Sequence, residues 1–283
     1  MMAEGSGMTE QRPTVADEIE RYLLTGETDL LHTAWSGDFM QRAERAHEDL
    51  RGALVSAVRQ RVEGLKPPPE HDADTVIFTR AKVAPMVRGL FARAEQDTVL
   101  AALEQSVVFV TSANIEQLLF GRGFDSTAWT IANLYLGGFG AKLLGDDAPD
   151  IVGFSVDATC FVSPRYFAEE DPFADFVVHE VAHIFHNCKR AAIGLRQTRG
   201  KEWLLDIQYL KRETFAYACE TFARLLERDK SRAGRQALAE EYERESRISD
   251  ERIEAKEIAG IVREAAAARN GWKVILARCS PTT

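Results

Sequence analysis

The sequence has few cysteines and no long apolar run. Its 283 residues include four cysteines, none in a CxxC spacing, which we interpret as free thiols in a reducing cytoplasm. No stretch reaches roughly 18 apolar residues, the length that a membrane-spanning helix needs. Residues 1–13, MMAEGSGMTEQRP, lack the basic start and apolar run of a signal peptide. We therefore expect a cytoplasmic protein without a membrane segment and with a disordered start at 1–13.

Positive charge is also scarce. Lysine and arginine number 35 against 44 aspartates and glutamates, which gives a formal net charge of −9. We expect no nucleic-acid binding, because phosphate recognition needs a basic surface. The hydrophobic content of 45% and the charged content of 28% are typical of a soluble globular protein. The length is sufficient for one large domain or two smaller ones.

The most informative stretch is residues 171–187, DPFADFVVHEVAHIFHN. Its HExxH pattern places His179 and His183 one helical turn apart, the spacing with which two histidines bind one zinc ion. Asp171 and Pro172 predict that a helix begins there, because aspartate caps helices and proline favours the first position. The rest of the segment is almost entirely apolar, so we expect a buried central helix. Imidazoles inside such a helix need partners, and a metal ion is the most economical one.

His186 lies on the same helical arc as His179 and His183. Three histidines on one straight helix cannot all reach one ion, because the outer two are too far apart. We therefore expect His186 to make a polar contact beside the metal site or at the surface, and not to bind the metal.

The third ligand must come from elsewhere in the chain, because two histidines leave a catalytic zinc short of one protein ligand. No Gly-x-x-His follows His183, so we expect a carboxylate from a following helix, predicted at residues 203–228. Three carboxylates lie along one line of that helix at intervals of seven residues: Asp206, Glu213 and Glu220. Seven residues span about 10.5 Å of helix axis, so only one of the three can bind a given metal.

These two segments together resemble the zincin metallopeptidases of the gluzincin type. HEVAHIF, with its uncharged variable positions and apolar continuation, is similar to the metal-binding helix of that superfamily. RETFAYACETFA, in which Glu213 comes 30 residues after His183, resembles the third-ligand helix of ImmA/IrrE-type peptidases. The resemblance covers roughly a fifth of the chain. It implies one Zn²⁺ per chain, bound by His179, His183 and Glu213, with Glu220 and Asp206 as alternatives to Glu213.

The reaction that the resemblance implies is hydrolysis of peptide bonds by a metal-activated water, with Glu180 as the general base. Tyr217, one helical turn after Glu213, is a candidate donor of a hydrogen bond to the tetrahedral intermediate. The expected partner is a peptide or protein substrate. The helical termini offer a surface for a protein partner, and helices within residues 14–66 are candidates to cover the cleft.

Two other functions stay open. A deformylase-type zinc amide hydrolase would take Cys160, in the segment CFVS, as a metal ligand ahead of HExxH. A regulatory or binding protein would use zinc for structure and its helical termini for interaction. Glu180 favours catalysis, because a purely structural zinc site does not need an adjacent carboxylate.

The whole pattern predicts a predominantly helical α+β fold, with a small sheet packed on the HExxH helix in a zincin-like core. The expected organisation is an N-terminal helical segment, a proline-rich linker, a catalytic core and a charged helical C-terminal region, over residues 14–66, 67–74, 75–230 and 231–283. Within the first segment, Thr14 caps one helix and Gly37 divides the helical pattern that follows at 29–62.

Short β-rich runs predict strands at 107–110, 151–154 and 159–162, and a last one at 274–276. The zincin resemblance makes 159–162 the candidate edge strand, to which an extended substrate could add as a further strand. A helical pattern at 79–104 bends at Pro85.

Basic residues gather in the loop at 188–201. Such a loop at the mouth of a cleft would favour acidic substrates, and the alternative is an ordinary solvated loop. Its basic residues are Lys189, Arg190, Arg196, Arg199 and Lys201.

Overall fold

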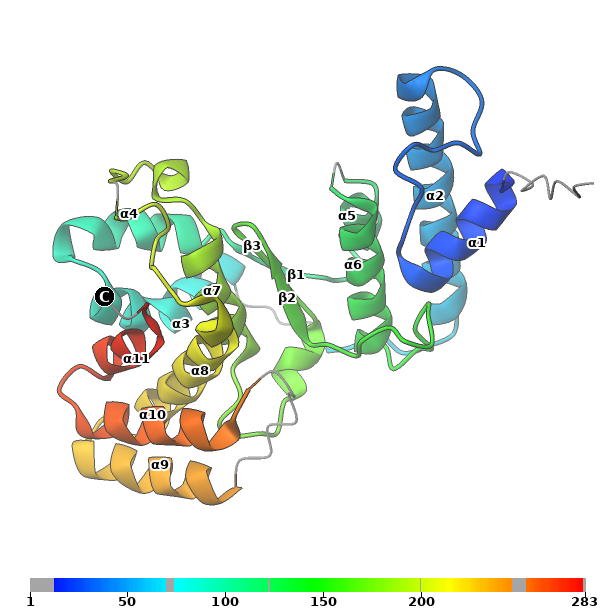
Figure 1. The fold of residues 1–283 in the computed structure, drawn as a ribbon. Helices are drawn as coiled ribbons and strands as arrows, with labels where there is room; N and C mark the ends of the chain where they lie inside the picture. The colour runs from blue at the N-terminus through cyan, green and yellow to red at the C-terminus, as the bar shows by residue number, and fades with distance from the viewer. Residues whose placement is uncertain (1–12, 70–73, 122, 199, 246–252, 282–283) are drawn as a thin grey trace, which may run out of the picture. The chain divides into compact units, whose positions relative to one another are not determined.

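The computed structural model describes residues 13–69, 74–121, 123–198, 200–245 and 253–281 (Figure 1). The predicted disordered start therefore lies almost wholly outside the described residues, as do positions 70–73 of the predicted linker and Arg199 of the basic loop. Within the described residues helices predominate beside one small sheet, which confirms the predominantly helical α+β class. None of the helices in this part of the chain combines the length and apolar character needed to cross a bilayer.

The chain folds into two compact units. Unit 1 comprises Met1–Pro67 and Thr111–Asp150, and unit 2 comprises Pro68–Val110 and Ile151–Thr283. The predicted ranges differ from this division, because residues 111–150 of the predicted core pack with the N-terminal helices. Unit 1 is therefore built from two stretches of chain that are far apart in the sequence.

The described part of unit 1 is helical. As predicted, its first helix begins at Thr14, which forms a capping box with Asp17. The second begins only after Asp38, whose side chain caps it, so the helix predicted from residue 29 is wrong over residues 29–38. The helices of unit 1 are α1 (Val15–Thr25), α2 (Phe39–Val62), α5 (Ile115–Leu119) and α6 (Asp125–Gly138).

Arg51 is the polar centre of unit 1. Its side chain is 1% exposed and forms an ion pair with Asp125, at 2.9 Å from Nε to Oδ1. Its remaining nitrogens donate to the carbonyl oxygens of Leu119 and Gly123, each at 2.7 Å. One side chain of α2 therefore binds the end of α5 and the start of α6, and its buried charge is fully paired.

Unit 2 contains the sheet and the helices around it. Its α-helices are α3 (Thr75–Leu90), α4 (Arg93–Leu103), α7 (Phe176–Asn187), α8 (Arg212–Arg228), α9 (Arg232–Glu245), α10 (Ala255–Ala267) and α11 (Gly271–Cys279). Short 3₁₀ helices, in the same unit, are η1 (Pro164–Ala168), η2 (Arg190–Ile193) and η3 (Tyr209–Lys211).

The sheet has three strands in the order β1-β3-β2: β1 (Val107–Phe109), β2 (Gly153–Val156) and β3 (Thr159–Val162). β1 runs parallel to β3, and β2 forms an antiparallel hairpin with β3 in which Phe154 pairs with Phe161. The predicted edge strand at 159–162 is therefore wrong. β3 lies in the centre with both sides paired, and β2 is the edge that packs against α7.

Helix α7 begins later than Asp171 and Pro172 predict. Asp175 caps it by accepting a hydrogen bond from the backbone of Val178 at 3.2 Å, whereas Asp171 accepts one from Phe173 in the preceding turn. Two competing capping sites lie four residues apart, and contacts from the rest of unit 2 select the second.

Helix α8 is also shorter than predicted, because residues 203–208 are not helical. Trp203 forms a β-bridge with Lys189, and the backbone N–H of Leu205 donates to the carbonyl of Phe185 at 2.8 Å. The strand predicted at 274–276 is wrong as well, since it lies in α11, which Asn270 caps.

The helix α3 continues through Pro85, and the chain breaks only at Phe91 and Ala92 before α4 begins. The bend predicted at Pro85 does not divide the helix.

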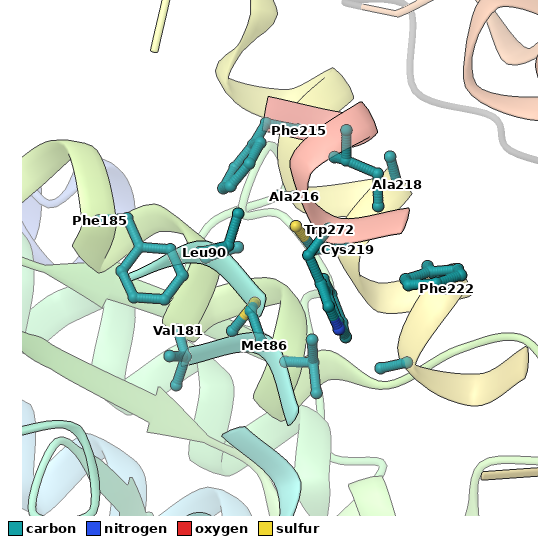
Figure 2. Packing of buried hydrophobic residues seen from close by; sticks show 14 of the residues in the cluster. Met86, Leu90, Val181, Phe185, Phe215, Ala216, Ala218, Cys219, Phe222 and Trp272 are labelled. Carbon is teal, nitrogen blue, oxygen red and sulfur yellow. The ribbon is translucent and has the colours of Figure 1, made fainter. Parts of the chain in front are cut away.

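The core of unit 2 forms where α7 and α8 pack against each other and against α3 and α11 (Figure 2). Phe222 of α8 packs edge-on against Trp272 of α11, with ring centroids 4.9 Å apart. Gly89 of α3 lets Trp272 approach, because a Cβ there would lie 2.1 Å from the indole. This packing fixes α7 and α8, the two helices that carry the predicted metal ligands.

Candidate metal centre

Two helices bring the predicted ligands together. His179 and His183 lie one turn apart on α7, and Glu213 lies in the first turn of α8. The two histidine Nε2 atoms are 3.2 Å apart. Oε2 of Glu213 is 3.6 Å from Nε2 of His179 and 3.5 Å from Nε2 of His183. These three side chains form a group that could hold a metal ion.

The distances suit a small tetrahedral ion. Bonds of about 2.0–2.1 Å at the tetrahedral angle place neighbouring ligand atoms about 3.3–3.4 Å apart. The three separations in this group, 3.2, 3.5 and 3.6 Å, bracket that value. Two imidazole nitrogens and one carboxylate oxygen also form a donor set that zinc accepts. The residues therefore fit the predicted metal, and a fourth position is left for a non-protein ligand.

The other two candidate carboxylates lie elsewhere. Asp206 is exposed in the non-helical segment before α8 and lines a different cavity, with Glu95 and Trp203. Glu220 is buried one heptad beyond Glu213, and its Oε2 atom is 2.9 Å from Nδ1 of His179. Glu213 alone of the three joins both histidines in the described residues.

Glu220 fixes the orientation of His179. Its Oε1 atom accepts a hydrogen bond from the backbone N–H of Asp175 at 2.7 Å, and its Oε2 atom faces Nδ1 of His179. A carboxylate at that distance holds the proton of the ring on Nδ1, so the lone pair of Nε2 points into the metal group.

His186 supports the second ligand. Its Nε2 atom lies 3.3 Å from Nδ1 of His183. Burial, together with the nearby charges of His183 and Arg212, lowers the pKa of His186 to about 3, so the ring is neutral and can accept a hydrogen bond. As predicted, His186 makes a polar contact beside the site and does not join the group of three.

A further network extends from the capping residue of α7. The carboxylate of Asp175, 1% exposed, accepts from Nζ of Lys82 at 2.7 Å and from the hydroxyl of Tyr166 at 3.1 Å. Because the N–H of Asp175 also binds Glu220, the start of α7 is joined to the residue that orients His179. Sequence analysis predicted no role for Lys82, Tyr166 or Asp175. Of the three, only Asp175 had a sequence signal, because it directly precedes the apolar run of α7.

The electrostatics of the group favour a cation. Burial by itself would lower the pKa of His179, but hydrogen bonds with Glu213 and Glu220 raise it to about 10. Burial likewise opposes ionisation of Glu213, yet the hydrogen bonds from His179 and His183 hold the pKa of Glu213 well below its usual range. A positive charge among these side chains is therefore stabilised, and a metal ion can take the place of the proton.

Glu180 lies beside the group and does not belong to it. It is 7% exposed, and burial raises its pKa, although His179 and His183 partly oppose that rise. Ser155 of β2 supplies a side-chain hydrogen bond to Glu180. Gly153, also on β2, lies so close that a Cβ there would be 3.0 Å from Cγ of Glu180. The edge strand thus packs directly on the predicted general base.

A cavity of about 600 Å³ opens beside these residues. Its wall consists of the three ligands and Glu180, the edge strand, the end of α7 and the segment before α8. The residues beyond the ligands and Glu180 are Ile151, Gly153, Phe154, Ser155, His186, Asn187, Tyr209, Leu210 and Arg212. A substrate could therefore reach the metal group from one side.

The remaining predicted residues have other surroundings. The ring of Tyr217 packs edge-on against His179, with centroids 4.5 Å apart. Cys160 is fully buried in β3 and is not part of the metal group in the described residues.

In the basic loop at 188–201, Lys189 forms an ion pair with Glu202, and the buried Arg190 pairs with Glu95. Those two cations are therefore neutralised within unit 2.

Comparison of the chain with protein-family models, with curated proteins and with solved structures finds no match.

Proposed function

We propose that this protein is a zinc-dependent hydrolase that cleaves peptide bonds. The observation that carries the proposal is the group of His179, His183 and Glu213, whose ligand atoms lie 3.2–3.6 Å apart beside a buried glutamate and an open cavity. Two histidines and one glutamate with an open fourth position are the ligand set of catalytic zinc. A purely structural site would be closed by a fourth protein ligand.

Glu180 is the proposed general base. Bound zinc would act as a Lewis acid towards water and towards the scissile carbonyl. The carboxylate of Glu180 would accept the proton of the attacking water and deliver it to the leaving amine. Its raised pKa supports this role, because a buried carboxylate holds a transferred proton more readily than an exposed one. Tyr217 remains the candidate donor to the tetrahedral intermediate.

The edge strand β2 is the proposed support for the substrate. Gly153, Phe154 and Ser155 line the cavity, and β2 has one side without a partner strand in the described sheet. An extended peptide could add along that side and present a peptide bond to Glu180. The substrate role that sequence reasoning gave to residues 159–162 therefore moves to β2.

The first test is the metal content of the purified protein by elemental analysis, for wild type, His183→Ala, Glu213→Ala and Glu220→Ala. We expect about one zinc per chain in wild type, loss of zinc in the first two variants and retention of zinc in the third. Digestion of a peptide library by zinc-loaded wild type and Glu180→Gln then tests the reaction. A wild-type protein that takes up no added zinc would contradict the proposal, and zinc binding without any digestion would favour a regulatory zinc protein.

A further inference from the structure

Arg212 has an unusual position in unit 2. It is the first residue of α8, directly before the ligand Glu213, and it lines the cavity beside the metal group. Among the side chains that line this cavity, in the described part of the chain, it is the one lysine or arginine. A guanidinium stays charged at any physiological pH, so Arg212 supplies a fixed positive charge to the cavity wall.

The guanidinium of Arg212 is held in place by an aromatic ring. Its central carbon lies 5.1 Å from the ring centroid of Tyr209, within the range of a cation–π contact. Its Nε atom is buried and has no hydrogen-bond partner within the described residues. A guanidinium orients two parallel donors towards a carboxylate, so an arginine positioned by a ring contact is ready to bind one.

The other two arginines of α8 each form an ion pair with a carboxylate of the protein. Arg228 also stacks on an aromatic ring, that of Phe173 at 4.9 Å, but it forms an ion pair with Glu241 at 3.0 Å. Arg224 pairs with Glu227 at 2.6 Å. No described carboxylate lies within ion-pair distance of Arg212. Two acidic residues line its cavity, Glu180 and Glu213, and a bound divalent cation would balance both of their charges.

We propose that Arg212 binds a carboxylate of the substrate, so that the site selects acidic peptides. This inference rests on the proposed function and names the substrate class of the same site. The carboxylate can come from an aspartate or glutamate side chain near the scissile bond or from the C-terminus of the peptide, since both present the same group to a guanidinium. Exposed Tyr209 and Leu210, 76% and 77% exposed, form the apolar rim beside it.

The test uses binding, so that it does not depend on turnover. Four probes carry a succinyl hydroxamate, which binds zinc, joined to a dipeptide that contains glutamate or glutamine and ends in a free acid or an amide. Dissociation constants are measured by calorimetry with the zinc-loaded protein. We expect one carboxylate position to tighten binding about tenfold over the uncharged probe, because a charge-assisted hydrogen bond contributes on that order. The probe that binds more tightly shows whether Arg212 binds the glutamate side chain or the C-terminal carboxylate of the peptide.

Three variants assign the preference to Arg212. Arg212→Gln should lose the preference for the acidic probe while still binding the uncharged one, and Arg212→Lys should keep part of it. Arg228→Gln is the matched control and should keep the full preference. Arg228 lies on the same helix as Arg212 and stacks on the ring of Phe173, outside the cavity. Zinc content and the thermal midpoint are measured for each, so that unfolding is recognised.

Each outcome has a defined meaning. Equal binding of all four probes by wild type, or an undiminished preference in Arg212→Gln, would overturn the inference. An acid preference in a protein that cleaves no peptide would uphold the inference and refute the proposed hydrolysis. Failure of every probe to bind the zinc-loaded protein would overturn this inference, whereas the zinc content of the same sample tests the metal centre separately.

Discussion

Each unit contains a buried polar centre, and the two centres differ in how their atoms are satisfied. In unit 1, Arg51 directs donors at Asp125 and at two carbonyl oxygens, so each contact joins a donor to an acceptor. In unit 2, the two Nε2 atoms and Oε2 of Glu213 converge within 3.6 Å of one another, so a proton or a metal ion must lie among them. The first arrangement is complete without a ligand, whereas the second is favourable only around a cation.

The two centres therefore have different expected roles. The Arg51 centre joins three helices, and no bound group is needed to balance its charge. The metal group opens onto a cavity, and Glu220 and His186 contact the Nδ1 atoms of its two histidines. Removing a residue from the first should change stability, and removing a residue from the second should change metal affinity or turnover.

The largest expected effect is that of Glu180→Gln on turnover. Loss of a general base lowers kcat by about 10²–10⁴-fold, while the zinc content stays the same because Glu180 is not a ligand. The measurement is hydrolysis of the best library peptide, beside elemental analysis. Glu169→Gln, at an exposed position, is the control. Full activity in Glu180→Gln would remove Glu180 from the mechanism.

The next effect is that of Arg51→Met on stability. The variant leaves Asp125 and the carbonyl groups of Leu119 and Gly123 without their partner. We expect this to lower the free energy of unfolding by about 2–4 kcal/mol, since Asp125 keeps some access to water. Urea unfolding followed by circular dichroism measures it. Arg59→Met, on the same helix with an exposed ion pair to Glu116, should change stability by less than about 1 kcal/mol. Zinc binding that fell in Arg51→Met would contradict the separation of the two centres.

A smaller effect is expected for Glu220→Gln. The amide no longer holds the proton of His179 on Nδ1 with a full negative charge, so zinc affinity should fall about 10–100-fold while the stoichiometry at saturation stays the same. Competition with a fluorescent chelator gives the affinity. Glu243→Gln, on α9 and paired with Arg263 away from the metal group, is the control. A loss of stoichiometry in Glu220→Gln would instead make Glu220 a ligand.

The smallest effect should come from Lys82→Met. Lys82 contacts Asp175, whose backbone holds Glu220, so the change acts on His179 through two intervening residues. We expect zinc affinity to fall by less than about tenfold. Lys142→Met, an exposed lysine of unit 1, should have no effect. An effect of Lys82→Met as large as that of Glu220→Gln would show that the network acts as one unit.

Local spacing made part of the site predictable. His179, His183 and Glu180 follow from the HExxH pattern, because a helix fixes the geometry of residues three and four apart. Glu213 followed from the resemblance of its segment, and the separation of Glu213 from Glu220 on one helix left only one of them near the two histidines. The helical class followed from the periodic apolar pattern over most of the chain.

Long-range contacts decided what the sequence left open. Asp171 is followed by a proline and was the stronger capping signal, but Asp175 caps α7 because Lys82, Tyr166 and Glu220 bind it. Residues 203–208 have a helical pattern, yet backbone hydrogen bonds from Leu204 and Leu205 to the end of α7 keep the segment out of a helix. Short strands of similar composition give no order across a sheet, so the central position of β3 could not be inferred.

The order of the strands has a consequence for synthesis on the ribosome. β1 pairs with β3, and the chain between Thr111 and Asp150 belongs to unit 1. Every residue of unit 1 is therefore translated before the first residue of β2. Unit 1 can fold before Ile151–Thr283, the larger part of unit 2, has been made, and β1 has no neighbouring strand until β3 emerges. The unit that contains the candidate metal centre is thus the last to form, although one of its strands is made early.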